Sequence, residues 1–156
     1  MAKKMCKHNR MSEVLPRLWI GGTKKHTEIA LSLDTYEWQI RRVRVVDTKP
    51  SKSESNERYF LCPNYGVPSY HLGWWGTQVA VYTLESRNSL TTVVTDLGGH
   101  GRSGLYCAIL MAHVLGITGN EAIARLRQMH CEQAVETAEQ EAYVVRIADE
   151  LRSWKG

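Results

Sequence analysis

The sequence predicts a single α/β domain, a three-layer sandwich in which helices flank a central, mostly parallel sheet. Short apolar runs of strand length alternate along the chain with longer runs whose apolar residues recur at helical spacing. The 156 residues, 43% of them hydrophobic, are enough for one buried core. No apolar run approaches the ~18 residues needed to cross a bilayer. The basic, polar start of the chain lacks the features of a secretion signal, so we expect a cytoplasmic protein.

In the first part of the chain, the pattern predicts three strands and one helix. A strand over 14–20 ends at two glycines, a second covers 43–46 and a third covers 58–61. Residues 23–33 are compatible with a helix, and the polar run 49–56 is a loop by composition.

The middle of the chain predicts a loop, a helix and one more strand. Pro63 and Pro68 bracket the loop, and Ser69 caps a helix whose apolar residues over 75–82 recur at helical spacing. A short buried strand over 92–94 then leads into a glycine-rich segment.

The last part of the chain is helical. Residues 105–115 are apolar on nearly every side, so this helix should run through the interior with its start rigidly held. We expect Asn120 to cap a shorter helix, and a final helix to close the domain. The shorter helix carries Ile123, Leu126 and His130, and the final helix presents Tyr143, Ile147 and Leu151 on one face.

Charge is distributed unevenly along the chain. Residues 1–60 hold 13 Lys and Arg against 7 Asp and Glu, whereas residues 61–156 hold 7 against 9. The basic half could attract nucleic acid or an acidic partner, but no helix-turn-helix, zinc-finger or aromatic RNA-binding motif accompanies it. We therefore favour solvated basic faces. The expected organisation is a basic tail over 1–12 and one domain over 13–156.

The four cysteines, Cys6, Cys62, Cys107 and Cys131, show no close pairing. This spacing argues against a disulfide framework or a zinc ribbon, so we expect free thiols and a cytosolic compartment. Cys6 and His8 supply only two ligands, and we expect no metal and no cofactor.

The most informative stretch is 92–104, where a β-rich run ends in a glycine-rich loop that opens into the apolar helix. Successive backbone N–H groups in such a loop converge with the positive end of the helix dipole, and Arg102 adds a planar set of donors. The stretch therefore predicts an oxyanion-binding loop composed of Leu97, Gly98, Gly99, His100, Gly101 and Arg102.

Two other glycine-loop functions are less favoured. Gly99, Gly101 and Gly104 fit the dinucleotide-binding fingerprint, but that unit needs a second strand after the helix, with an acidic residue at its end. Residues 119–122 have the pattern of a helix start instead. A Walker loop is excluded because Arg102 stands where a lysine is required.

Asp96, five intervening residues and Arg102-Ser103-Gly104 together resemble the signature of the cysteine-dependent protein tyrosine and dual-specificity phosphatases, with Asp96 at the cysteine position. Residues 14–21 are similar to the opening strand of the small dual-specificity members, and 62–68 to their acid loop. The segments that follow the loop in this family are matched by 119–122, 134–137 and 140–144. The resemblance covers nearly the whole chain and implies a dual-specificity-phosphatase-like fold.

The same resemblance shows where the chemistry departs from the family. There a thiolate attacks phosphorus, the loop and its arginine stabilise the oxyanion, and an aspartate protonates the leaving oxygen. By position these roles fall on Asp96, on the loop with Arg102, and on Asn64, and the resemblance implies that Ser103 hydrogen-bonds within the loop and caps the helix. Thr95 stands where a histidine is usual, and no other cysteine is followed at the same spacing by an arginine. Only the anion-binding role survives.

Three functions remain open from the sequence. The favoured one is a pseudophosphatase, a binding or regulatory module in which ionised Asp96 fills the loop; its expected partner is a phosphoprotein or another acidic protein, not a membrane or nucleic acid. The second is a phosphatase whose cysteine and aspartate were replaced in this chain. The third is an unrelated hydrolysis using Asp96 with His100 or His71, although attack by Asp96 on a phosphate calls for a metal to screen two anions.

Overall fold

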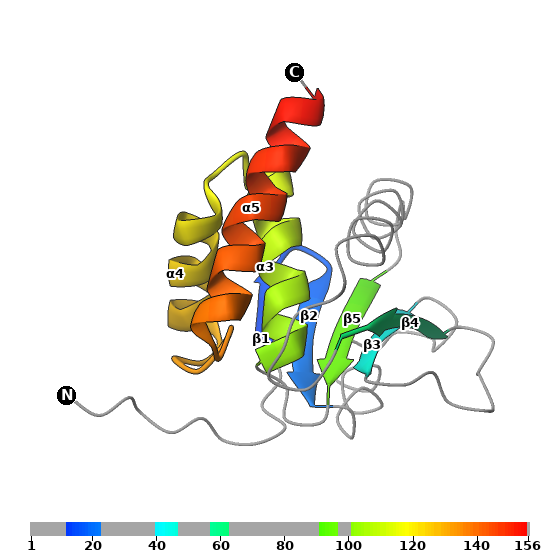
Figure 1. Cartoon of the computed structure of the whole chain (residues 1–156). Helices are drawn as coiled ribbons and strands as arrows, with labels where there is room; N and C mark the ends of the chain where they lie inside the picture. Colours follow the sequence, from blue (N-terminus) through cyan, green and yellow to red (C-terminus); the bar gives the residue numbers. More distant parts are fainter. Residues whose placement is uncertain (1–11, 23–39, 47–56, 63–90, 97–100, 156) are drawn as a thin grey trace.

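The computed structural model describes residues 12–22, 40–46, 57–62, 91–96 and 101–155 (Figure 1). These ranges contain five strands and three helices. In chain order the elements are β1 (Ser12–Leu15), β2 (Leu18–Gly22), β3 (Ile40–Val46), β4 (Glu57–Leu61), β5 (Thr91–Asp96), α3 (Gly101–Leu115), α4 (Gly119–Met129) and α5 (Ala138–Lys155).

The five strands form one mixed sheet in the order β1-β2-β5-β3-β4. Strand β1 runs antiparallel to β2, and the other three neighbouring pairs are parallel. The centre of the sheet is β5, where Val93 and Val94 are fully buried, as expected for a parallel strand covered on both faces. The predicted mostly parallel sheet is therefore confirmed, and β3, β4 and β5 are each longer than predicted.

The predicted single strand over 14–20 is wrong, because the structure has a hairpin there. Strands β1 and β2 are joined at Pro16 and Arg17, and Arg17 has a φ of 66°. Proline presets the backbone for the first central position of a tight turn, and a positive φ at the next residue reverses the chain. The Arg17 carbonyl then accepts a hydrogen bond from the Thr92 N–H at 2.8 Å, which ties the turn to β5.

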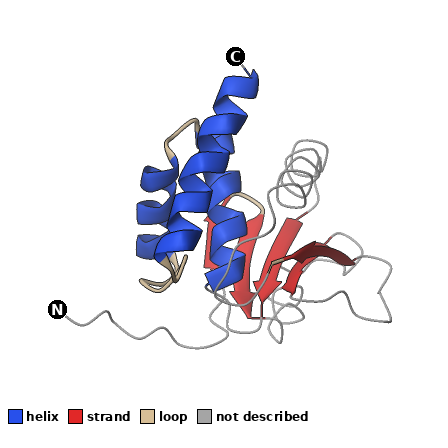
Figure 2. Cartoon of the chain, viewed as in Figure 1, coloured by secondary structure: helices blue, strands red, loops and turns tan. Residues whose placement is uncertain are grey.

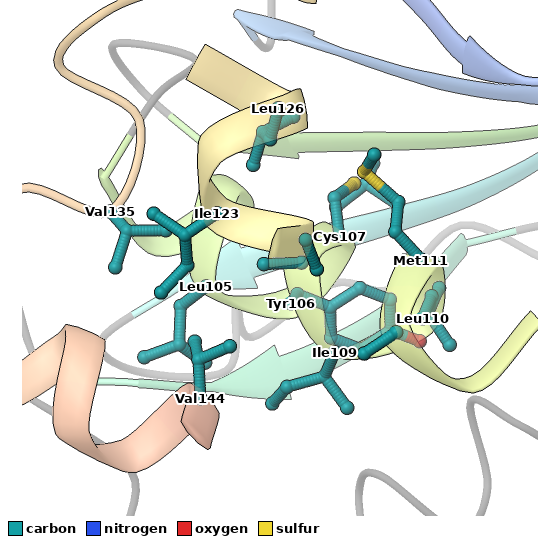
Figure 3. Packing of buried hydrophobic residues seen from close by; sticks show 14 of the residues in the cluster. Leu105, Tyr106, Cys107, Ile109, Leu110, Met111, Ile123, Leu126, Val135 and Val144 are labelled. Carbon is teal, nitrogen blue, oxygen red and sulfur yellow. The ribbon is translucent and has the colours of Figure 1, made fainter. Parts of the chain in front are cut away.

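Helices α3, α4 and α5 pack together and lie on one face of the sheet (Figures 1 and 2). Residues 105–112 of α3 are at most 6% exposed and form the middle of the core, with α4 and α5 packed around them (Figure 3). The prediction that this helix runs through the interior is confirmed. Within the described ranges no single helix is long and apolar enough to span a bilayer; residues 103–115 and 119–129 reach that length and composition only together, across a bend of 115°.

Helix α4 begins at a different cap from the one predicted. Thr118, and not Asn120, is the N-cap, and its hydroxyl accepts a hydrogen bond from the Glu121 N–H at 3.1 Å. At the other end, His130 lies just beyond the helix as its C-cap and donates its N–H to the Leu126 carbonyl at 2.9 Å. The His130 ring is buried and lies 2.8 Å from the Ser12 hydroxyl, so α4 is joined to β1.

The final helix is confirmed, with its predicted residues Tyr143, Ile147 and Leu151 all buried. It starts with a reciprocal capping box. The Thr137 hydroxyl accepts from the Gln140 N–H at 3.1 Å, and the Gln140 side-chain oxygen accepts from the Thr137 N–H at 3.3 Å. This pair of bonds determines where α5 begins.

The cysteines are not all free, as the sequence analysis expected. Cys62 and Cys107 are buried free thiols, but Cys131 is disulfide-bonded. Spacing arguments detect only cysteines that lie close in sequence, and a bond formed across the fold leaves no local pattern. Cys6 lies outside the described residues, as do the tail over 1–11, the two predicted helices over 23–33 and 75–82, and the two predicted loops over 49–56 and 63–68.

Candidate functional site

The candidate site lies where strand β5 ends. Asp96 is the last residue of β5 and pairs with Gly22 at the end of β2, while Thr95 pairs with Arg44 of β3 on the other side. Both neighbours are parallel to β5, so their carboxyl ends meet at one edge of the sheet. In open α/β sheets ligands bind outside this edge. The fold therefore places Asp96 in the centre of the edge where a ligand is expected.

Helix α3 starts at the same edge. Figure 1 shows its first turn beside the arrowheads of β2 and β5. Gly101, Arg102 and Ser103 occupy this turn, where backbone N–H groups lack acceptors within the helix and the dipole is positive. Ser103 is completely buried. The structure thus brings the backbone of Asp96 and of the Arg102 turn to one end of the sheet.

Part of the predicted site lies outside the described residues. Leu97, Gly98, Gly99 and His100 connect β5 to α3, and Asn64 belongs to the segment that follows β4. Cys62 directly follows β4 and is fully buried in the core. Because β4 is parallel to its neighbour β3, the chain leading to Asn64 leaves the sheet at the carboxyl edge, the edge that also holds Asp96.

The connection between α4 and α5, residues 130–137, packs against the first turn of α3. A Cβ atom at Gly104 would lie 2.8 Å from the Val135 backbone nitrogen and 3.4 Å from the Ala134 Cα. Gly104 is thus required for close approach of two backbones. Figure 3 shows the Val135 side chain in the same cluster as Leu105 and Ile123. This connection forms a wall beside the candidate site.

Arg127 holds this wall in place, and the sequence patterns did not identify Arg127 as a functional residue. Its Nε donates to the Ala134 carbonyl at 2.9 Å, and its Nη2 donates to the Val135 carbonyl at 2.7 Å and to Glu141 Oε1 at 2.6 Å. These partners lie between 7 and 14 residues from Arg127, so no helical spacing links them. The matched family segments over 134–137 and 140–144 were the only signal that this region adjoins the site.

The Gly104 contact gives the first testable prediction. Gly104→Ala should lower the free energy of unfolding by about 1–3 kcal/mol, because a methyl group placed 2.8 Å from a backbone nitrogen forces the wall or the helix to move. The control is Ala142→Gly at an exposed position of α5. It makes the reverse exchange and measures helix propensity, so it should itself lower the free energy of unfolding by about 1 kcal/mol. Urea unfolding measures both. A Gly104→Ala protein as stable as the parent would contradict the close approach.

The helices also decide against the dinucleotide interpretation of the glycine loop. A βαβ unit requires a strand after the helix that follows the loop. Residues 101–155 are described without a gap and contain α3, α4 and α5 but no strand. As for metals, no group of three or more His, Cys, Asp or Glu that could hold an ion is found among the residues whose positions the structure describes.

Comparison with solved structures identifies the class of fold. A leucine rich repeat and phosphatase domain containing protein from Entamoeba histolytica superposes with a TM-score of 0.71 at 7% identity, covering 94% of this chain and 95% of that one. For human DUSP28 the TM-score is 0.69 at 15% identity, with coverage of 97% and 99%. Tk-PTP in its active form gives 0.68 at 19% identity, with coverage of 90% and 96%. The chain has the fold of the protein tyrosine and dual-specificity phosphatases.

Sequence comparison is less informative about what the chain does. No protein-family model matches it. Two uncharacterized proteins of Methanocaldococcus jannaschii are similar, at 44% identity over 88 residues and 45% over 87, each match covering 56% of this chain. The matched regions span 56% and 52% of those two proteins. The chain therefore matches only about half the length of its curated relatives.

Proposed function

We propose that this chain is a pseudophosphatase, a protein with the tyrosine and dual-specificity phosphatase fold that acts as a binding or regulatory module without hydrolysing phosphate esters. The observation that carries the proposal is the position of Asp96. A carboxylate ends the central strand β5, and four residues separate it from the helix whose first turn contains Arg102. In the phosphatases that this chain resembles, a cysteine nucleophile stands there.

A carboxylate at this position changes what the site can hold. The N–H groups at the start of α3, the helix dipole and Arg102 all favour a negative charge, and the Asp96 carboxylate supplies one. Two unit charges ~4 Å apart repel each other by about 4 kcal/mol at an effective dielectric constant near 20, and a phosphate dianion is repelled more strongly. Under this proposal the Asp96 carboxylate fills the oxyanion site, so phosphotyrosine binds poorly.

The second departure also opposes turnover. Asn64 stands where the resemblance places the general acid, and an amide cannot protonate a leaving oxygen. Loss of general acid catalysis alone slows such reactions by about 10²–10⁴. Thr95, which is buried, stands where a histidine is usual. A change at this third position favours natural divergence over deliberate replacement of the two catalytic residues, and so favours the pseudophosphatase over a disabled enzyme.

The proposed partner is a phosphoprotein or another acidic protein. The first 60 residues hold 13 basic and 7 acidic side chains, an excess of 6 positive charges, and this imbalance favours an acidic surface in the partner. If the Asp96 carboxylate fills the oxyanion site, the partner is recognised at a surface other than a phosphotyrosine pocket.

The proposal predicts that the purified, unaltered chain releases no phosphate from p-nitrophenyl phosphate or from a tyrosine-phosphorylated peptide. Any residual release should be the same in an Arg102→Ala variant, because it would come from a contaminant. Isothermal calorimetry with the phosphopeptide should show no micromolar binding. Phosphate release at ordinary enzyme rates, about 1–10³ s⁻¹, would overturn the proposal.

A further inference from the structure

We propose that Arg127 is a positioning residue for the oxyanion site, although it lies outside the site itself. It fixes residues 134–137 of the wall, and this part of the wall in turn fixes the first turn of α3, which carries Arg102. The inference deepens the proposed function and rests on it in one respect, namely that the turn binds oxyanions once Asp96 is neutralised. The argument has three structural steps, from the helix outward to Arg127.

The first step is the contact between the wall and the helix. The space for a Cβ atom at Gly104 is filled by the Val135 backbone nitrogen, 2.8 Å away. Gly104 is two residues after Arg102 and belongs to the same helical turn. A displacement of Val135 by a few tenths of an ångström therefore changes the position that the first turn of α3 can occupy. Packed interiors transmit such displacements because they contain few voids.

The second step is the conformation of Val135. Its φ is 59°, in the left-handed region that a β-branched residue rarely adopts, and its side chain is completely buried. Backbone strain of this kind persists only where the surroundings over-determine it, and it clusters at functional sites. Val135 would relax toward an ordinary conformation if its neighbours released it. The wall therefore needs an external restraint.

The third step is the restraint itself. Four consecutive residues of the wall each have a backbone group bound by a side chain. Arg127 donates to the carbonyls of Ala134 and Val135, and Gln140, which is completely buried, accepts from the N–H groups of Glu136 at 2.8 Å and Thr137 at 3.3 Å.

Of the two restraining side chains, only Arg127 binds Val135 directly. Glu141 binds the same guanidinium at 2.6 Å and orients it. Arg127 thus acts on the strained residue that touches Gly104.

This geometry requires an arginine and not merely a positive charge. The guanidinium presents its donors in a fixed plane, so Nε and Nη2 can bind two successive carbonyls at once. A lysine keeps the charge opposite Glu141, but its compact ammonium group on a flexible stem cannot reproduce the planar pair of bonds. Arg127→Lys therefore removes the restraint on Val135 while leaving the net charge of the chain unchanged.

The test compares Arg127→Lys with Arg146→Lys, both in an Asp96→Asn background. Arg146 forms an exposed i,i+4 pair with Glu150 on α5 at 3.2 Å, so the control makes the same chemical change away from the wall. Isothermal calorimetry with tungstate, at a temperature where circular dichroism shows both proteins folded, measures the affinity. We expect Arg127→Lys to bind tungstate about tenfold more weakly, at the lower end of the 10–100-fold losses seen for residues that orient metal ligands. Arg146→Lys should bind as tightly as the background.

Equal affinities of the two folded variants would overturn the inference. If Arg127→Lys does not fold, Glu141→Gln replaces it, because this change weakens the orientation of Arg127 and leaves both carbonyl bonds possible. It should lower the tungstate affinity in the same direction and by a smaller factor. An unchanged affinity in that variant would also overturn the inference.

A second measurement separates this inference from the proposed function. If Asp96→Asn alone binds no tungstate, the proposal that the Asp96 carboxylate fills the oxyanion site fails. The role of Arg127 is then tested by backbone amide chemical shifts, with each substitution made in the otherwise unaltered chain. Arg127→Lys should shift the backbone amide signals of Gly104 and Leu105, at the start of α3, and Arg146→Lys should not. Unshifted Gly104 and Leu105 signals would show that Arg127 does not position the helix.

Discussion

The double substitution Asp96→Cys with Asn64→Asp is expected to produce a chain that hydrolyses an aryl phosphate, whereas the unaltered chain does not. The cysteine would stand at the end of β5, where the first turn of α3 favours its thiolate form. The aspartate would restore a proton donor for the leaving oxygen. Compared with Asp96→Cys alone, the second change should raise the rate by about 10²–10⁴. Release of p-nitrophenol at pH 6–7 (about the range in which such a thiolate and acid pair coexist) measures both.

The control for this experiment is Asp96→Ser with Asn64→Asp. It restores the acid and removes the carboxylate without supplying a thiolate, so it should remain inactive. The buried Thr95 remains in all these variants, and whatever the usual histidine contributes stays absent. If the Asp96→Cys, Asn64→Asp protein is folded and inactive, the loop has lost the geometry that supports transfer. This result would contradict the predicted rescue but not the absence of turnover in the unaltered chain, because a loop that has diverged also hydrolyses nothing.

Neutralising Asp96 should have the second largest effect, this time on binding. Asp96→Asn removes the built-in anion and nearly preserves the size of the side chain. Relief of a repulsion of about 4 kcal/mol corresponds to an affinity for tungstate or inorganic phosphate about 10³-fold higher than that of the unaltered chain. Isothermal calorimetry at low ionic strength measures the difference, because salt screens part of the interaction.

Arg102 provides the control for the binding experiment. In the Asp96→Asn background, Arg102→Ala should reverse most of the gain, since Arg102 is the only Lys or Arg among residues 97–102. A gain that survives the loss of Arg102 would place the bound anion elsewhere. An Asp96→Asn protein with unchanged affinity would mean that the carboxylate does not occupy the site.

These two experiments and the Arg127 comparison address different parts of one arrangement. The first asks whether the loop can still support phosphoryl transfer, and the second asks what occupies it now. The third asks what holds the first turn of α3 in place. Because Arg127 acts through Ala134 and Val135 and not through the loop, its substitution should lower affinity without introducing or removing a charge at the site.

Local patterns predicted the elements that carry the site. β-Branched residues before the glycines identified β5, and the unbroken apolar run after them identified α3, because both signals depend on neighbours within one element. They failed where two local signals competed. Pro16 lay within an apparently continuous strand, and its turn was overlooked. Thr118 and Asn120 are both good N-cap residues two positions apart, and nothing local ranks them.

At the start of α4, the choice between Thr118 and Asn120 as N-cap is seen only in the tertiary structure. A Cβ atom at Gly119 would lie 2.7 Å from the Val145 Cα, so α4, which begins directly after Thr118, is packed against α5 at its first residue. This start does not follow from neighbouring residues, because it depends on a surface that another part of the chain provides.

The α/β class, the central strand and the buried helix follow from the residues alone. These are properties of composition, periodicity and spacing, which act over a few residues. The wall held by Arg127 emerged only from the folded chain. Its contacts join Arg127 to partners 7–14 residues away and Val135 to Gly104, 31 positions earlier in the chain. Contacts of this kind leave no periodic trace, because packing between helices decides which backbone groups meet.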